Sequence, residues 1–341
     1  PAAARPAAEP AAPAAEAGSP RTPTIPSFRS LIAQLSPRPE AQPVQVSPQA
    51  KEALFECVET FKGQEATVLS LSLVGADRLA IGSFDGALRL WDLVEIKELF
   101  VLRSGGGAVL SSAALGPGTL ATGHFDGAAR IWDLETRREA TAFRSKSGQV
   151  WSLLALESGR KLAAGSNDGS LRLWDTEAGA ELINVQGHSK AVTGLEALAG
   201  GRLASCSKDG LVRLWDVEAA TEGALLDAGA GAVTGVEAVA EGRLAAGYQD
   251  GGVRVWDTEA AVQLATLKMG STQVWSVLSL GSLLIAGYET GVVRVWDWQQ
   301  AVEVATLRGH GKAATCLVAL ADGRFASGSS DGTLKIWAPS K

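Results

Sequence analysis

The chain has 341 residues and a net charge of −6, from 31 basic and 37 acidic side chains. That length excludes a small disulfide-stapled fold and suits one large domain or two smaller ones. The acidic balance argues against general binding to nucleic-acid phosphates and to anionic membranes, and no apolar run has the length of a membrane-spanning helix. We therefore expect neither a nucleic-acid partner nor membrane insertion.

Residues 1–50 differ in composition from the rest of the chain. They hold eleven of the 13 prolines and many alanines. A segment of this kind buries too little apolar area to offset the entropy of ordering. We expect a disordered Pro/Ala-rich tail over residues 1–50, followed by a folded domain over residues 54–338.

The folded part is built from one unit that returns seven times. The clearest copy is LASCSKDGLVRLWD at residues 203–216, and the second-last residue of each copy is a tryptophan that we call the late tryptophan. The late tryptophans are 40 to 42 residues apart: Trp91, Trp132, Trp174, Trp215, Trp256, Trp296 and Trp337. A fixed period near forty residues indicates an array of one supersecondary unit.

Each unit carries the signals of four short strands. In the fourth copy, apolar runs at residues 203–205 and 211–215 flank Asp209-Gly210. An Asp-Gly dipeptide supplies the positive φ angles of a tight turn, so we expect a hairpin with a two-residue turn. Two further runs lie upstream, at residues 181–185 and 192–195. Four strands in forty residues, without a helical period, are typical of one propeller blade.

The repeats resemble those of the WD-repeat β-propeller family over residues 54–338. That family carries Gly-His early and Trp-Asp late in each repeat, and His188 and His310 each stand 27 residues before a late tryptophan. The resemblance implies an all-β fold, a seven-bladed WD-repeat β-propeller. It says less about function, because one fold hosts many functions.

The first ordered residues are expected to close the ring. Gln64 stands 27 residues before Trp91, the same offset as His310 before Trp337, so the ordered part begins with an outer strand. The last repeat ends without an outer strand of its own. An N-terminal strand that completes the last blade, as is usual in the resembled family, leaves no open sheet edge at the seam.

Two repeats match the hydrogen-bonded tetrad of the resembled family. The two sets are His188, Ser205, Asp209 and Trp215, and His310, Ser327, Asp331 and Trp337. The resemblance implies buried structural networks, since buried polar groups need partners; a catalytic triad is disfavoured because nothing nearby suggests a nucleophile elbow. Four other repeats lack both the histidine and the Ser/Thr, and we expect these blades to depend on apolar packing. They carry Ile81, Ala164, Ala246 and Ala286.

A basic residue stands two positions before each late tryptophan. The set is Arg89, Arg130, Arg172, Arg213, Arg254, Arg294 and Lys335. Seven cations in a ring could contact nucleic acid. Their fixed place beside the Trp and Asp of one strand favours local ion pairs and stacking on tryptophan.

The candidate partner-binding residues come from the family resemblance. In the resembled family, the residues flanking the first Val of each inner strand and the residue before the turn Asp are contact positions on one rim. After the Val, or after Ala314 in the last repeat, stand Leu69, Leu110, Trp151, Thr193, Thr234, Trp275 and Thr315; before it stand Gln149 and Gln273; at the turns stand Phe84, Phe125, Asn167, Lys208, Gln249, Glu289 and Ser330. Trp151 and Trp275 are the strongest candidates, because tryptophan dominates binding hot spots. The alternative is that both rings pack flat between blades.

The inner strands also carry small residues, two positions after the first Val or, in the last repeat, after Ala314. They are Ser70, Ser111, Ser152, Gly194, Gly235, Ser276 and Cys316. We expect a small, uncharged channel wall, which disfavours an enzyme with a channel-end active site. There is no P-loop, dinucleotide fingerprint or pair of catalytic carboxylates, and the three histidines and three cysteines lack zinc-site spacing. We expect no catalytic residue, no metal and no cofactor.

The resemblance implies a protein-interaction scaffold that presents a rigid rim to partner proteins or peptides as a subunit of a multiprotein complex. One alternative is the substrate-receptor subunit of a ubiquitin ligase or a similar machine. The cysteines, in no paired pattern, favour a reducing compartment, the cytosol or the nucleus.

Overall fold

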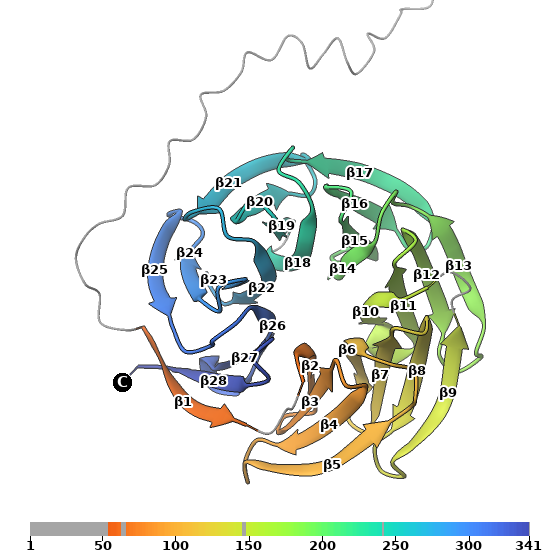
Figure 1. Cartoon of the computed structure of the whole chain (residues 1–341). Helices are drawn as coiled ribbons and strands as arrows, with labels where there is room; N and C mark the ends of the chain where they lie inside the picture. Colours follow the sequence, from red (N-terminus) through yellow and green to blue (C-terminus); the bar gives the residue numbers. More distant parts are fainter. Residues whose placement is uncertain (1–53, 63–65, 145–147, 241, 341) are drawn as a thin grey trace, which may run out of the picture. The chain divides into compact units, whose positions relative to one another are not determined.

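A computed structural model describes residues 54–62, 66–144, 148–240 and 242–340. These residues form seven four-stranded antiparallel sheets arranged as blades around one axis (Figure 1). The predicted all-β, seven-bladed propeller is confirmed. The tail expected over residues 1–50 lies outside the described residues.

Blades 1 to 6 each consist of four consecutive strands, from the inner to the outer edge. Blade 1 has β2 (Val68–Val74), β3 (Arg78–Ser83), β4 (Ala87–Asp92) and β5 (Lys97–Arg103). Blade 2 has β6 (Val109–Gly116), β7 (Thr119–His124), β8 (Ala128–Asp133) and β9 (Arg138–Arg144). Blade 3 has β10 (Val150–Leu156), β11 (Lys161–Ser166), β12 (Ser170–Asp175) and β13 (Glu181–Gln186).

The second half of the ring repeats this plan. Blade 4 has β14 (Val192–Leu198), β15 (Arg202–Ser207), β16 (Leu211–Asp216) and β17 (Thr221–Asp227). Blade 5 has β18 (Val233–Ala240), β19 (Arg243–Tyr248), β20 (Gly252–Asp257) and β21 (Val262–Lys268). Blade 6 has β22 (Val274–Leu280), β23 (Leu283–Tyr288), β24 (Val293–Asp297) and β25 (Val302–Leu307). Blade 7 joins β26 (Ala314–Ala319), β27 (Phe325–Ser329) and β28 (Leu334–Pro339) to β1 (Phe55–Phe61). Two short 3₁₀ turns, Glu157–Gly159 and Ala321–Gly323, follow inner strands.

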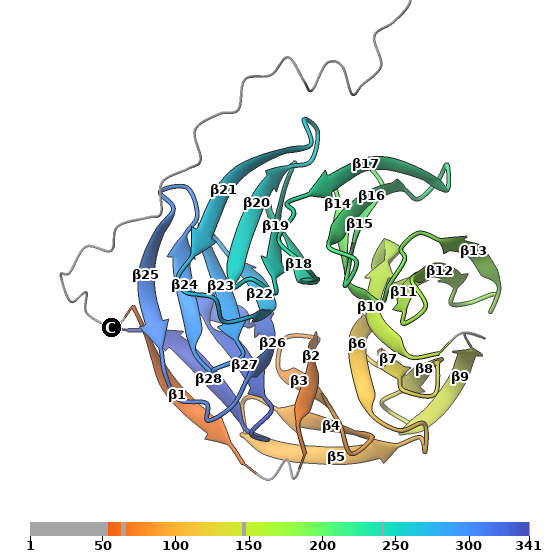
Figure 2. The same cartoon turned by 45° about the horizontal axis from the view of Figure 1, so that its top comes forward.

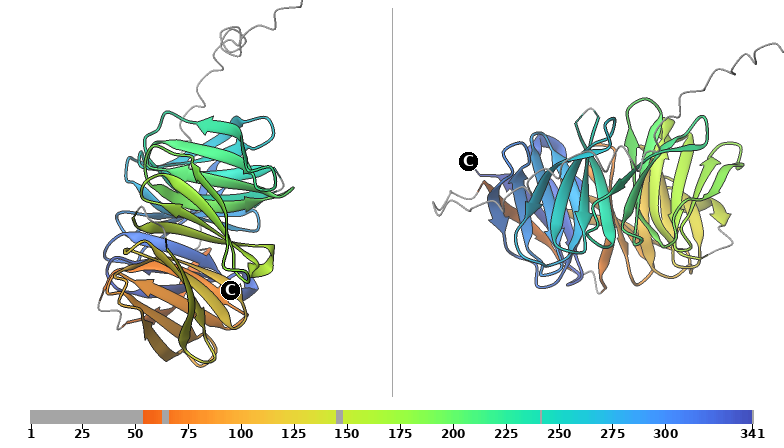
Figure 3. Two further views of the ribbon diagram at one scale, coloured as in Figure 1. Left: turned by 90° about the vertical axis from the view of Figure 1, so that its right-hand side faces the viewer. Right: turned by 90° about the horizontal axis from the view of Figure 1, so that it is seen from above.

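The hydrophobic core is divided among the spaces between neighbouring blades. Leu88 and Leu90 of blade 1 pack in one cluster with Leu120 and Trp132 of blade 2. Side chains on both faces of a blade are therefore buried, which explains the continuous apolar runs of the sequence. Figure 2 shows the strands of each blade stacked outward, and Figure 3 shows them running across the thickness of the ring, so that the loops gather at two rims.

The Asp-Gly turns differ from the two-residue turn expected. Three residues, Phe84 to Gly86, connect β3 and β4; Gly86 donates its N–H to the Ser83 carbonyl at 3.1 Å, and of the three only Gly86 has a positive φ, +78°. This is the loop in which a type I turn is followed by a left-handed residue. Asp85 stays right-handed because its carboxylate accepts the Ala87 N–H at 3.0 Å, as in an Asx-turn.

Strand β1 closes the ring, as predicted. It pairs with β28 from Phe55, opposite Pro339, to Phe61, opposite Leu334. Its two ends are anchored by buried aromatic rings: Phe55 lies 5.3 Å from the Phe325 ring, and Phe61 lies 4.9 Å from Trp91 of blade 1. The strand therefore covers the open edge of blade 7 and also binds that blade to blade 1.

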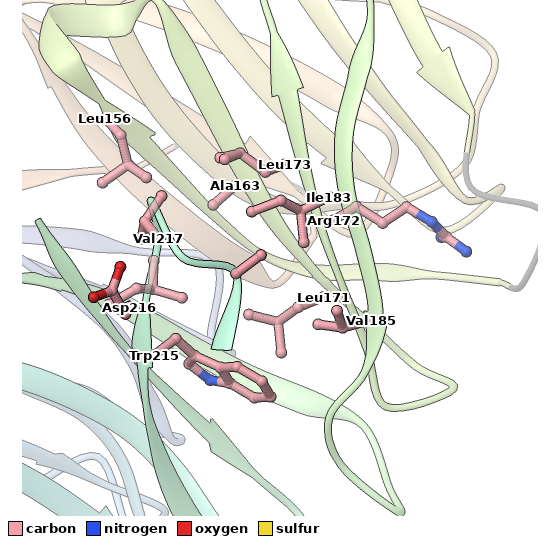
Figure 4. A pocket seen from close by; sticks show the side chains of 12 residues that line it. Leu156, Ala163, Leu171, Arg172, Leu173, Ile183, Val185, Trp215, Asp216 and Val217 are labelled. Atoms are coloured by element: carbon pink, nitrogen blue, oxygen red, sulfur yellow. The ribbon is translucent and has the colours of Figure 1, made fainter. Parts of the chain in front are cut away.

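One inter-blade space is incompletely filled. A cavity of about 40 Å³ lies between blades 3 and 4, and Figure 4 shows its apolar lining, including Leu173, Ile183 and Val217 around the Trp215 ring. Arg172 and Asp216 also border the cavity, but its wall is almost entirely apolar and offers few polar partners to a water molecule. We interpret it as a packing defect beside a late tryptophan.

Candidate partner-binding site

A β-bulge interrupts every inner strand at the same place. In β10 the pairing passes from Val150 directly to Ser152 and leaves Trp151 without a partner, and the same shift occurs in the other six blades. A bulge bends the strand and redirects the side chain of the extra residue. The seven bulge residues are Leu69, Leu110, Trp151, Thr193, Thr234, Trp275 and Thr315, and all seven line one cavity of about 450 Å³, which we call the channel mouth.

The turn residues lie beside this ring because each turn is held by a backbone hydrogen bond. The Lys208 N–H donates to the Ala191 carbonyl at 3.0 Å, and the Gln249 N–H donates to the Ala232 carbonyl at 2.9 Å. The five other turns make the equivalent bond to the residue that precedes the inner strand. Lys208, Gln249, Ala232 and Gln273 complete the lining of the channel mouth. We call this side of the ring the mouth rim.

The two rim tryptophans have different surroundings. Trp151 is half-buried; its indole N–H donates to Asn167 Oδ1 at 3.1 Å, and Lys208 Nζ lies 4.4 Å from the ring centroid. Trp275 is 37% exposed. Within the described part of the chain, its side chain makes no recorded hydrogen bond or cation–π contact. One tryptophan is thus held in place, and the other is free to adapt.

The nine predicted partner-binding residues are divided between the mouth and the surrounding rim. Trp151, Trp275, Gln273 and Lys208 line the mouth. The other five are not among its lining residues: Gln149 is half-buried, and Phe84, Phe125, Asn167 and Glu289 are exposed on turns. Ala232 was not among the predicted residues, although it occupies the same position as Gln149 and Gln273.

Three of the seven small residues of the inner strands are buried, in contrast to the open channel wall that we expected, and the other four are half-buried; the buried ones are Ser70, Ser111 and Ser152. Ser111 and Ser152 are buried, and their hydroxyls donate to the Val150 and Val192 carbonyls of the next blade at 3.4 and 3.3 Å. Their size is limited by the space that the neighbouring strand and the next blade leave. A Cβ on Gly165 would meet Ser152 Oγ and Val192 Cγ1 at 2.5 Å. These serines therefore connect neighbouring blades, and their presence does not determine the polarity of the channel wall.

Two glutamates stand at equivalent positions of neighbouring inner strands, and the sequence reasoning missed them. Glu237 accepts the Ser279 N–H of the next blade at 3.2 Å, and Glu196 accepts a hydrogen bond from the Ala238 backbone. Burial raises the pKa of both carboxyls, and the charge of Glu237 raises the pKa of Glu196 further. A Glu at the same place in two adjacent, otherwise apolar runs was the available signal. Both carboxylates therefore serve to join neighbouring blades.

In blade 4 the structure brings the four tetrad residues together. His188 contacts Asp209 Oδ2 through Nδ1 at 3.0 Å and Ser205 Oγ through Nε2 at 2.8 Å, and the Trp215 indole N–H donates to Ser205 Oγ at 2.8 Å. His188 and Ser205 are buried, so no substrate reaches the hydroxyl. Burial also lowers the pKa of His188, against the opposing effect of Asp209. This is a structural network that joins the turn to the late tryptophan.

Blade 7 makes a modified version of the network. His310 Nε2 lies 2.7 Å from Ser327 Oγ, which accepts the Trp337 N–H at 2.8 Å. The other imidazole nitrogen lies 2.9 Å from Thr333 Oγ1, and Asp331 is 3.7 Å away. Asp331 instead accepts the Thr333 hydroxyl at 2.6 Å. Thr333 therefore stands between His310 and Asp331, whereas the histidine and aspartate of blade 4 contact each other directly.

Blade 2 contains a third histidine network that was not predicted. His124 Nε2 lies 2.8 Å from Thr122 Oγ1, and the Trp132 N–H donates to the same hydroxyl at 2.7 Å. This histidine ends β7, so it reaches the threonine from a different point in the chain than His188 reaches Ser205. Thr122 at the Ser/Thr position, followed two residues later by a histidine, was the available signal.

Blades 5 and 6 place tyrosine where blade 2 has His124. Tyr248 and Tyr288 are buried, and the hydroxyl of each interacts with the indole N–H of the late tryptophan of its blade, Trp256 and Trp296 respectively. Arginines from the same blades lie over the two rings, at 4.5 Å for Arg254 and 5.5 Å for Arg294. Packing and ring contacts replace the histidine network in these blades.

The basic residues before the late tryptophans are engaged in local contacts. Arg89 pairs with Asp85 at 3.1 Å, and Arg254 pairs with Asp250 at 2.8 Å. The four other arginines also pair with a carboxylate of their own blade, and Lys335 donates to Thr60 at 3.0 Å. The expected ion pairs are present, whereas the recorded stacking of this set is on tyrosine rather than on tryptophan. These cations are not arranged for phosphate contacts.

Comparison with known proteins identifies the repeat. The family model described as WD40, the WD domain or G-beta repeat, matches residues 55–92, 138–175, 179–216 and 301–338. A comparison with curated proteins found no match. Over the described ranges, no group of three or more His, Cys, Asp and Glu side chains is placed to hold a metal ion. No described helix is both long and apolar enough to span a bilayer.

Proposed function

This chain is a WD-repeat β-propeller protein, and we propose that it acts as a protein-interaction scaffold whose partners bind at the channel mouth. Propellers of this family typically bind proteins and are typically non-catalytic. The observation that carries the proposal is the ring of seven bulge residues, which directs one side chain from every blade into a single cavity of about 450 Å³.

The rigidity of this surface supports the proposal. Every turn on the mouth rim is fixed to the neighbouring inner strand by a backbone hydrogen bond of 2.9 to 3.1 Å. A partner that binds here orders few groups of the propeller, which lowers the entropic cost of association. The exposed rings of Phe84 and Phe125, at 63% and 53%, extend the apolar surface beyond the mouth. Several exposed apolar side chains on one rim are typical of an interaction site.

The proposal extends to a place in a multiprotein complex, in the cytosol or the nucleus. The thiols of Cys57, Cys206 and Cys316 are all unpaired, which is compatible with a reducing compartment. The substrate receptor of a ubiquitin ligase would use the same surface. Among the described residues, the alternative of an enzyme is supported only by the carboxylates of Glu196 and Glu237. Backbone N–H groups already donate hydrogen bonds to both carboxylates.

The experiment is a quantitative affinity purification with the full chain as bait, from cells that express it. The test variant is Trp151→Ala/Trp275→Ala, and the control is Val94→Ala, which removes an exposed apolar side chain from the opposite rim. We expect the double variant to lose proteins that both the wild type and the control retain. An identical set of retained proteins for all three baits would contradict the proposal.

A further inference from the structure

The channel mouth presents a mainly apolar surface despite its three threonines. Thr193 donates its hydroxyl to the Val233 carbonyl at 2.7 Å, and Thr315 donates to the Val68 carbonyl at 2.6 Å. Thr234 donates to the Gly247 carbonyl at 3.0 Å. Because these hydroxyls are already bonded to the propeller, a ligand meets the threonine methyl groups together with leucine and tryptophan side chains. The volume lies within the range of roughly 300–1,000 Å³ that is typical of ligand sites.

The charge in the lining is positive. Lys208 is the charged residue among those that line the mouth, and it is exposed. In contrast to the arginines before the late tryptophans, it has no carboxylate recorded within ion-pair distance among the described residues. Lys190 lies in the loop to which this turn is bonded; it too is exposed, and no described carboxylate is recorded as its ion-pair partner. Blade 4 therefore brings two uncompensated ammonium groups to the mouth rim.

The nearby carboxylates do not cancel this charge. Asp209, next to Lys208, is turned into the blade, where its side chain is 5% exposed and accepts bonds from His188 and the Ser189 N–H. Glu289 is exposed on the blade 6 turn, whose backbone is bonded to Gln273 beside Trp275. Lys312, which is also exposed, lies in the loop against the blade 6 turn at Gly291. The mouth rim is therefore positive at blade 4, whereas Glu289 and Lys312 place both signs of charge at blades 6 and 7.

We propose that the channel mouth binds an extended acidic peptide segment of a partner protein, with an apolar side chain inserted beside Trp275 and a carboxylate placed at Lys208. This inference rests on the proposed scaffold function and specifies the partner's chemistry. The Trp151 ring contacts the Lys208 ammonium through a cation–π interaction, so the ammonium is held at the mouth before the partner arrives. Charge complementarity of this kind sets the orientation and the rate of binding.

The test uses two fluorescein-labelled probe peptides and the full chain. In one peptide, aspartate alternates with leucine and phenylalanine; in the other, lysine replaces aspartate. We expect fluorescence anisotropy to show binding of the acidic peptide, weakened at least tenfold by Lys208→Glu and by added salt. Glu289→Lys, which removes a negative charge from the same rim, should increase that affinity.

Equal affinity of the wild type and Lys208→Glu for the acidic peptide would overturn the inference, as would equal or tighter binding of the basic peptide. Melting temperatures of both variants verify that the exposed substitutions leave the fold intact. If Trp151→Ala/Trp275→Ala releases cellular partners and Lys208→Glu does not, the acidic preference is wrong and the scaffold proposal stands. If neither variant releases them, both proposals fail.

Discussion

Blade 6 contains two tryptophans with opposite surroundings. Trp296 is paired on both sides, with Leu284 of β23 and with Glu303 of β25, and is 1% exposed. Trp275 lies in the bulge of β22 and is 37% exposed. Blade 3 repeats the contrast with Trp174, which is 3% exposed, and Trp151 at the channel mouth.

The difference separates two tasks in one repeat. The ladder position carries tryptophan in all seven blades, because the inter-blade core requires the same large ring each time. The bulge position carries leucine, tryptophan or threonine. A residue in the bulge has no partner in the strand pairing, so its side chain can vary without disrupting the blade. We infer that the regular positions provide stability and the bulge positions provide recognition.

The largest effect is expected when the ring of regular positions is opened. Deleting residues 1–61 removes β1, uncovers the edge of β28, and takes away the Phe55 and Phe61 ring contacts. We expect aggregation or loss of the cooperative melting transition, measured by circular dichroism and light scattering. Deleting residues 1–53 keeps β1 and is the control. Equal melting temperatures for the two truncations would show that β1 does not close the ring.

The two tryptophans of blade 6 provide the next test. Trp296→Ala should lower the free energy of unfolding by about 3–5 kcal/mol, as is usual for a buried aromatic side chain. Trp275→Ala should cost less than about 1 kcal/mol, because its ring is partly in solvent. Urea denaturation of both variants measures the difference. Similar losses would remove the distinction between ladder and bulge positions.

A smaller loss is expected from His188→Ala, which leaves Ser205 and Asp209 buried with one partner fewer. The cost should be roughly 1–3 kcal/mol in the free energy of unfolding. Phe84→Ala, on a turn where the ring is 63% exposed, is the control and should leave stability nearly unchanged. A His188→Ala protein as stable as this control would argue that packing alone holds blade 4.

The last effect depends on pH and concerns the glutamates between blades 4, 5 and 6. Burial raises the folded-state pKa of Glu237, so the folded protein binds more protons than the unfolded chain above the ordinary pKa of 4.5. The free energy of unfolding therefore falls as pH rises from about 4.5 through the raised pKa. Glu237→Gln keeps an acceptor for the Ser279 N–H and should be more stable than the wild type at pH 8 by roughly 1–3 kcal/mol.

At pH 4.5 this gain should disappear. His124, His188 and His310, whose pKa values burial lowers, reduce stability as pH falls below 6.5, but they do so equally in both proteins. Glu218→Gln, at an exposed glutamate between β16 and β17, is the control. A gain for Glu237→Gln that is independent of pH would show that the carboxyl does not titrate in this range.

The fold could be predicted from the sequence because its signals are periodic. The spacing of the late tryptophans and the match between Gln64 and His310 were sufficient for the seven blades and their closure. The turn type required the Asp85 side-chain bond to Ala87. The positions of Trp151 and Trp275 on the rim followed from the family resemblance. Their convergence on one cavity did not, because a bulge is a break in pairing that leaves no compositional trace in β10 or β22.

The polar networks were predictable only where the spacing was regular. His188 occupies the expected place before Trp215. His124 reaches Thr122 from another direction, and Thr333 stands between His310 and Asp331. Which side chain completes a network depends on the distances between side chains in the folded blade. The spacing of residues along a repeat does not specify these distances.

The central claim is that the bulge ring binds partners, and calorimetric titration of a retained partner into Trp275→Ala protein tests it most directly. The account predicts that Kd rises roughly thirtyfold, equivalent to about 2 kcal/mol, as for a typical hot-spot tryptophan. The Tm of the same preparation should stay within a few degrees of the wild-type value. An unchanged Kd together with a sharp fall in Tm would contradict the account and assign Trp275 to the core.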